Sequence, residues 1–187
     1  MTEVIGRRER KKAQTRQALA DAALALFLER GYDQVGVKEV ADVADVSVTT
    51  LFKHFPSKEA LVFDQDEDVE AALVEAVHGR PPAHTIVDAL RKHILRDVSD
   101  DRPGEEFIRL IESTPALRDY ARRMWMRHET ALARAIAKES GAPPDDVACA
   151  ALARFTLASR ELIVAHPHPR RAAEEIFARL ERGWRTE

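Results

Sequence analysis

Residues 37–62, VKEVADVADVSVTTLFKHFPSKEALV, contain two short amphipathic segments joined by a turn. In the first segment, residues 37–44, apolar side chains recur at helical spacing, and so short a helix is stable only when it packs on another element. Ser47 is a good N-cap for a second helix that follows it directly. Pro56 disfavours helical geometry at the preceding residue, so this helix should end near Phe55. The stretch therefore predicts two short helices that pack together.

The turn between these helices indicates a helix-turn-helix. Asp45 lies where the backbone must be left-handed, and Asp is among the few residues besides Gly that tolerate that conformation. The angle between the helices should be set by a small internal core of Val40, Ala41, Val46 and Leu51. The second helix then presents outward Val48, Thr49, Thr50, Lys53 and His54. Hydroxyl, methyl and ammonium groups of this kind suit contacts with base edges and phosphates in a major groove.

The rest of the chain also reads as helices, so the predicted fold class is all-α with about nine helices. Apolar residues from Leu19 onward recur at i, i+3, i+4 and i+7, and Gly31 ends this helix. Gly and Pro residues, which commonly end helices, divide the rest of the chain into predicted helices at 58–77, 85–97, 105–112, 116–140, 145–165 and 170–184. We find no alternating apolar and polar run that would indicate a strand.

The composition narrows the class of protein further. The chain has 187 residues, a mass of 21.0 kDa and one cysteine, so an internal disulfide framework is excluded. No run approaches the roughly 18 apolar residues of a membrane-spanning helix, and the first residues lack the apolar stretch of a secretory signal. We therefore expect a cytoplasmic protein without a membrane partner.

Taken alone, the formal net charge of −3 argues against a nucleic-acid partner, but the charge is unevenly distributed. Residues 1–62 hold 10 Lys and Arg against 9 Asp and Glu, and the remainder holds 19 against 23. Within residues 1–12 the cations form a basic N-terminal arm, made of Arg7, Arg8, Arg10, Lys11 and Lys12. Such a run is also compatible with an ordinary solvated tail.

The spacing of residues 37–61 resembles the pattern that closes the DNA-binding domain of the TetR family of transcriptional regulators. The matching residues are Val37, Val40, Ala41, Ala44, Val46, Ser47, Thr50, Leu51, His54, Phe55, Ser57, Lys58, Glu59 and Leu61. Residues 22–31 resemble the end of the family's first helix. Three positions depart from the pattern: Asp45 and Thr49 replace glycines, and Phe52 replaces a tyrosine. The operator sequence therefore cannot be transferred from a relative.

The resemblance implies a DNA-binding domain at residues 13–73, with its helix-turn-helix at about 36–55, and a C-terminal ligand-binding and dimerisation domain at 74–187. It implies that DNA contacts come from Lys38, Ser47, Val48, Thr49, Thr50, Phe52, Lys53, His54 and Lys58. We expect Lys58 at the N-terminus of a helix, where its charge and the helix dipole would both favour a phosphate oxygen. For His54 a buried packing role is the alternative.

Residue-level roles in the C-terminal domain come from the apolar pattern alone. The last two helices carry the candidate dimer interface, namely Ala151, Phe155, Leu162, Ile176, Phe177 and Leu180. Candidates to line an effector pocket are Phe63, Ile86, Leu90, His93, Phe107, Ile111, Trp125 and His128. For both sets, ordinary packing in the chain's own core is the alternative. The scarcity of polar clusters favours a small, largely apolar effector.

These features predict a homodimeric repressor that a small effector releases from a palindromic DNA operator. The alternative is a helical protein-interaction module that no longer binds DNA. We expect no enzyme, since the chain has no nucleophile elbow, phosphate-binding glycine loop or zinc-protease motif. We also expect no cofactor and no metal, because neither the acidic run 64–70 nor the pair His166 and His168 has ligand spacing.

Overall fold

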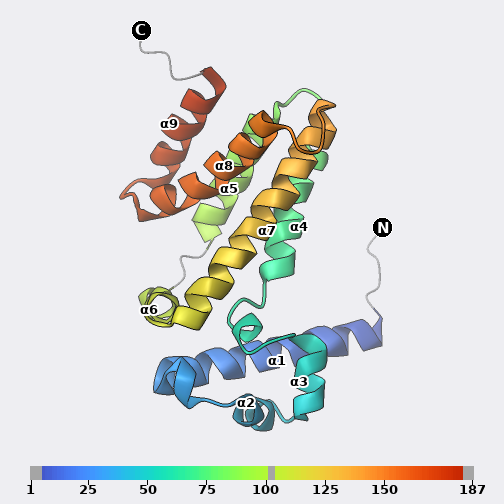
Figure 1. The fold of residues 1–187 in the computed structure, drawn as a ribbon, viewed down its shortest axis with the longest axis vertical. Helices are drawn as coiled ribbons and strands as arrows, with labels where there is room; N and C mark the ends of the chain where they lie inside the picture. Colours follow the sequence, from blue (N-terminus) through green and yellow to red (C-terminus); the bar gives the residue numbers. More distant parts are fainter. Residues whose placement is uncertain (1–5, 101–103, 183–187) are drawn as a thin grey trace. The chain divides into compact units, whose positions relative to one another are not determined.

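The computed structural model describes residues 6–100 and 104–182, and these residues form an all-helical fold (Figure 1). The α-helices are α1 Arg7–Arg30, α2 Val37–Val43, α3 Val48–His54, α4 Asp66–His78, α5 Ile86–Asp100, α6 Glu105–Ser113, α7 Pro115–Ser140, α8 Val147–Ala165 and α9 Pro169–Arg182. Two 3-10 turns, η1 Tyr32–Gln34 and η2 Glu59–Leu61, follow α1 and α3. The predicted fold class and helix number are confirmed over this range. The predicted end of the last helix, Trp184, and the first five residues of the basic arm lie outside it.

The helices form two packed units. The N-terminal unit comprises residues 1–66 and 103–121, and the C-terminal unit comprises residues 67–102 and 122–187. The predicted boundary at residue 73 therefore falls inside α4, where Leu73 is already part of the core of the C-terminal unit. Helix α6, which the sequence analysis placed in the C-terminal domain, belongs to the N-terminal unit because Leu110 is buried in that unit's core.

The core of the N-terminal unit is built on one face of α1. That face buries Leu19, Ala20, Ala23 and Phe27, and α1 packs against α2 and η1. The helix ends at Gly31, whose φ of +86° is accessible to glycine, as the sequence predicts. Its first turns, from Arg7, are part of the basic arm, so the described part of that arm is helical.

The C-terminal unit consists of α4, α5, most of α7, α8 and α9 (Figure 1). Helix α5 packs against both α8 and α9, and α8 packs against α9. Its core includes Leu90, Ile94, Leu132, Ile136, Ile163 and Phe177. Among the described residues, no helix is long and apolar enough to cross a membrane.

The predicted continuous helix at 58–77 is wrong, because the chain forms η2 and a turn before α4 begins at Asp66. The three consecutive side chains of Ala60, Leu61 and Val62 are all buried in one core. An α-helix would spread three consecutive side chains over about 200° of its circumference, so it could not bury them all against the same surface. Ser57 caps this segment as predicted, since its Oγ accepts a hydrogen bond from the Ala60 N–H at 3.3 Å.

Candidate nucleic-acid interface

The turn between α2 and α3 has the geometry that the sequence predicts. Asp45 is the one non-glycine residue with positive φ among the described residues, at +53°. The Val46 N–H donates to the carbonyl oxygen of Ala41 at 2.9 Å, which closes the turn. Val40, Ala41 and Leu51 are fully buried between the helices and α1. The predicted helix-turn-helix is therefore confirmed.

Ser47 fixes the start of α3. Its Oγ accepts a hydrogen bond from the Thr50 N–H at 3.1 Å, and it shares a second bond of 2.9 Å with the Thr50 hydroxyl. An N-cap of this kind contributes about 1 kcal/mol to helix stability. Ser47 and Thr50 therefore orient the helix, and both hydroxyls already have a partner before any DNA is bound.

The solvent face of α3 carries the candidate base-reading side chains. Thr49, Phe52 and Lys53 are exposed, while Val48 is half-buried against the core. The Phe52 ring is 48% exposed, which makes it one of the few large apolar side chains left outside the core of this unit. Lys38 on α2 is also exposed and forms a solvent-accessible ion pair with Asp42 at 3.4 Å. These residues offer hydroxyl, apolar and cationic contacts on one short helix and its neighbour.

His54 ends α3 and is half-buried. Burial lowers the pKa of its imidazole, and the nearby charges of Lys12 and Arg16 lower this pKa further. Its Nδ1 is buried and has no hydrogen-bond partner among the described residues. The structure therefore supports both the packing role that the sequence left open and a location at the edge of the α3 surface.

The lowered pKa of His54 makes the stability of the protein depend on pH. Because the folded-state pKa lies below the unfolded value of about 6.5, the unfolded chain takes up the proton first as pH falls. The contribution of His54 to the free energy of unfolding is fully present above about pH 6.5, and it is lost as the pH falls from there to the folded-state pKa. We expect His54→Gln to flatten the decrease in unfolding free energy between pH 7 and 5.5, measured by urea unfolding. His168→Gln, an exposed histidine outside this unit, is the control, and equal slopes for all three proteins would contradict the expectation.

Arg16 organises the end of α3, a role that the sequence analysis missed. Its guanidinium donates from Nη1 to the carbonyl oxygen of His54 at 2.7 Å and from Nη2 to that of Asp64 at 2.6 Å. The same group lies over the Phe55 ring, 4.4 Å from its centroid. Arg16 therefore joins α1 to the end of α3 and to the turn before α4. The partners lie 38 and 48 residues away, so no local pattern could have revealed them.

The predicted position of Lys58 at the N-terminus of an α-helix is wrong, while its contact with a phosphate stays a prediction. No α-helix begins at Lys58, and its Nζ donates to the Tyr32 carbonyl oxygen at 2.5 Å. The ammonium lies 4.0 Å from the centroid of the Tyr32 ring, and burial lowers the pKa of Lys58. Next to it, the Tyr32 hydroxyl donates to Glu59 at 3.0 Å. Lys58 thus holds η2 against the end of α1.

The predicted effector residues do not gather in a single core. Phe63, Phe107 and Ile111 pack on the core of the N-terminal unit. The other five belong to the C-terminal unit, namely Ile86, Leu90, His93, Trp125 and His128. Leu90 is a fully buried core residue there. The eight residues therefore cannot all line one pocket within either unit.

A polar cluster lies inside the C-terminal unit around the fully buried His128. Its Nε2 lies 4.0 Å from a carboxylate oxygen of Glu70 on α4. The Trp125 ring meets the imidazole edge-on, with centroids 5.2 Å apart, and the Arg160 guanidinium lies 5.5 Å from the centroid of the Trp125 ring. This cluster brings two of the predicted effector residues together with two charged side chains that the sequence analysis did not select.

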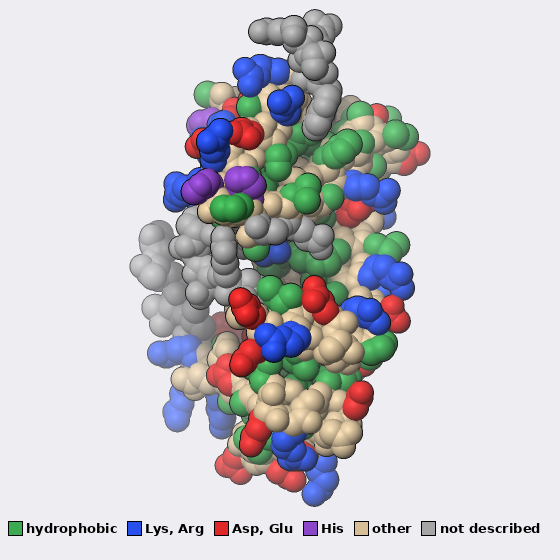
Figure 2. Space-filling view, turned by 90° about the vertical axis from the view of Figure 1, so that its left-hand side faces the viewer, with side chains coloured by type: hydrophobic (Ala, Val, Ile, Leu, Met, Phe, Trp, Pro, Cys, Tyr) green, Lys and Arg blue, Asp and Glu red, His purple; other side chains and the backbone are tan. Residues whose placement is uncertain are grey.

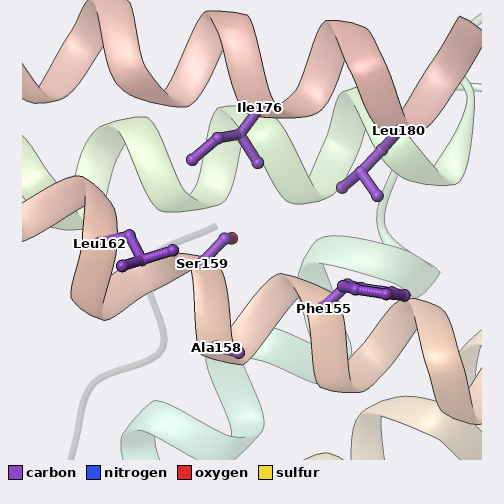
Figure 3. A pocket seen from close by; sticks show the side chains of 6 residues that line it. All are labelled: Phe155, Ala158, Ser159, Leu162, Ile176 and Leu180. Atoms are coloured by element: carbon purple, nitrogen blue, oxygen red, sulfur yellow. The ribbon is translucent and has the colours of Figure 1, made fainter. Parts of the chain in front are cut away.

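Four of the six predicted dimer residues line an apolar cleft between α8 and α9 (Figure 3), namely Phe155, Leu162, Ile176 and Leu180. Its volume is about 310 Å³, and its lining is Phe155, Ala158, Ser159, Leu162, Ile176 and Leu180. Phe155 and Leu162 are 59% and 68% exposed, and Ala151 is also exposed on α8. Phe177 is wrong as an interface residue, because it is fully buried in the chain's own core.

A capped recognition helix on a small three-helix core, joined to a separate helical unit, defines a helix-turn-helix regulator. The family described as bacterial regulatory proteins of the tetR family matches residues 19–64, and the MftR C-terminal domain matches residues 80–184. The chain belongs to the TetR family, and it is a DNA-binding transcriptional regulator.

Individual relatives agree with this assignment. The HTH-type transcriptional regulator TcmR of Streptomyces glaucescens is 33% identical over 152 residues, which cover 75% of this chain and 67% of TcmR. The putative mycofactocin biosynthesis transcriptional regulator MftR of Mycobacterium tuberculosis is 27% identical over 141 residues, covering 73% and 71%. A TetR-family regulator from Streptomyces coelicolor superposes with a TM-score of 0.61 at 21% identity, covering 95% of this chain and 98% of that one. The structural likeness supports the fold.

Proposed function

We propose that this protein is a homodimeric repressor, which a small, largely apolar effector releases from a palindromic DNA operator. The observation that carries the proposal is α3, a capped helix whose Thr49, Phe52 and Lys53 side chains face solvent. Seven residues read too few base pairs for specific binding. Two copies related by a two-fold axis would place two such helices in successive major grooves, about 34–36 Å apart.

The cleft between α8 and α9 supports dimerisation. Its exposed Phe155 and Leu162 side chains would cost free energy if they stayed in water, because burying such a side chain is worth about 1.5–3 kcal/mol. In a dimer with a two-fold axis the same surface of both subunits forms the contact, so each of these residues is buried once from each subunit. Two helices from each subunit would then form a four-helix contact, with Ile176 and Leu180 as the floor.

The polar cluster around His128 supports an effector site in the C-terminal unit. An apolar molecule among these helices would use Glu70, His128 or Arg160 as its polar anchor. An effector lowers DNA affinity only if it binds more tightly to the conformation in which the two α3 helices do not fit successive grooves. The alternative function, a protein-interaction module without DNA binding, is an outcome of the experiment below.

The test is selection of duplexes from a random DNA pool by the full chain, followed by binding measurements with the enriched duplex. Lys53→Ala should lower the affinity by at least about tenfold and reduce the salt dependence. Lys138→Ala is the control, because Lys138 is an exposed lysine of α7 in the C-terminal unit. Fluorescence anisotropy at several KCl concentrations gives both quantities. If no duplex is enriched, or the two variants bind equally well, the repressor proposal is overturned.

A further inference from the structure

Phe52 is the exception among the aromatic side chains of the N-terminal unit. In the described part of this unit, residues 6–66 and 104–121, every other Phe and Tyr side chain is buried in the core or packs against it. These are Phe27, Tyr32, Phe55, Phe63, Phe107 and Tyr120. Phe52 is 48% exposed and belongs to neither group. Packing in the chain's own core therefore does not account for an aromatic ring at this position.

Exposure alone does not identify a binding residue. On the face drawn in Figure 2, hydrophobic side chains are scattered between charged ones, and single exposed apolar side chains are ordinary on protein surfaces. What distinguishes Phe52 is its location on the solvent face of α3, where Thr49 and Lys53 are also exposed. The ring is therefore part of the surface that the proposed function uses to bind base pairs.

The chemistry of the ring limits what it can contact in a major groove. A phenylalanine side chain has no hydrogen-bond donor or acceptor, so Phe52 cannot form a hydrogen bond with a phosphate or with the polar edge of a base. The apolar group that base pairs present in this groove is the 5-methyl group of thymine. Thr49 carries a methyl group three residues before Phe52, and side chains at this spacing are neighbours on a helix. These two side chains form a small apolar surface that fits a thymine methyl group.

We propose that Phe52, with the methyl group of Thr49 beside it, recognises the 5-methyl group of a thymine in each half of the operator. This inference rests on the proposed function and adds to it which base α3 selects. The contact removes apolar surface of the ring and of the methyl group from water, which favours thymine over the other three bases. Because the contact neutralises no phosphate, this selectivity should not change with salt concentration.

The experiment removes the methyl group from the DNA and the ring from the protein, separately and together. The probe is a palindromic duplex that the wild-type chain enriches from a random pool. In a series of copies, one thymine at a time is replaced by uracil in both half-sites. Uracil still pairs with adenine and keeps the O4 acceptor, so the methyl group alone is lost. Burying one methyl group contributes about fourfold in affinity, so at one thymine position we expect wild-type binding to weaken by about 16-fold over the two half-sites.

Phe52→Ala should bind the thymine and uracil duplexes of that position almost equally, because the ring that contacts the methyl group is absent. Leu28→Ala is the matched control, since Leu28 is a large apolar side chain of the same unit, 40% exposed, near the end of α1. It should keep the wild-type ratio of the two affinities. Fluorescence anisotropy at a low and a high KCl concentration measures these ratios, and circular dichroism spectra and melting curves compare the folding of the variants.

The uracil series with the wild-type chain already tests the inference without any protein variant. If no replacement of thymine by uracil weakens binding, or if the enriched duplexes share no thymine, the inference is overturned. It is also overturned if Phe52→Ala keeps the wild-type ratio, or if Leu28→Ala loses that ratio as well. In each of these cases the enriched duplex still upholds the proposed function. If the wild-type chain enriches no duplex at all, the proposed function itself fails.

Discussion

Arg16→Ala is expected to lower the free energy of unfolding by about 2–4 kcal/mol and to abolish most specific DNA binding. Each of the two carbonyl oxygens that lose the guanidinium becomes an unsatisfied, partly buried acceptor, and such a group costs about 1–3 kcal/mol. The end of α3 also loses its attachment to α1. Urea unfolding followed by far-UV circular dichroism measures the first effect, and anisotropy with an enriched duplex measures the second.

Two further variants separate positioning from direct phosphate contact. Arg16→Lys keeps the charge, but a single ammonium group cannot match the planar fork that reaches both carbonyl oxygens. It should therefore recover only a small part of the stability and of the DNA affinity. Gln14→Ala, an exposed change on the same helix, should leave both unchanged. If Arg16→Ala unfolds like the wild type, or if Arg16→Lys binds DNA normally, Arg16 has no positioning role.

Leu162→Glu is the variant with the second large effect, because it puts a carboxylate in the proposed dimer contact. The side chain is 68% exposed in the single chain, so the folded subunit should tolerate the substitution. In a two-fold interface two carboxylates would be buried at once without partners, which costs several kcal/mol. We expect the dimer dissociation constant to rise by about 100-fold or more, and operator affinity to fall with it. Sedimentation analysis over a protein concentration series measures the change.

Ala150→Glu is the matched control for this prediction. It adds the same charge at an exposed position of α8, but on a face turned away from the cleft residues. The control should dimerise like the wild type. If Leu162→Glu also dimerises like the wild type, α8 and α9 do not form the subunit contact. If both variants are monomeric, the effect comes from net charge and the proposed contact again fails.

The features that the sequence predicted correctly depend on residues close together in the chain. The left-handed turn at Asp45 and the cap at Ser47 follow from rules that span about four residues. The end of α1 at Gly31 follows in the same way. These local features are sufficient to define the helix-turn-helix and the solvent face of α3.

The features that the sequence did not predict depend on residues far apart in the chain. The sequence predicts that Lys58 begins an α-helix, but Lys58 lies before η2 and its Nζ donates to the Tyr32 carbonyl oxygen 26 residues earlier. The role of Arg16 likewise requires knowing where residues 54 and 64 fold. Phe177 lies three residues before the half-buried Leu180 and therefore on nearly the same face of α9, so the pattern alone could not tell which of the two the chain buries completely.

In the proposed complex, two copies of this chain bind one symmetric DNA site through α3. The most direct measurement is the mass of the complex, by light scattering after size-exclusion chromatography, on an enriched palindromic duplex and on a duplex that keeps only one half-site. We expect at least two chains on the palindrome, in even number, and loss of the stable complex on the single half-site. A complex of one chain per duplex, with equal affinity for both duplexes, would contradict it.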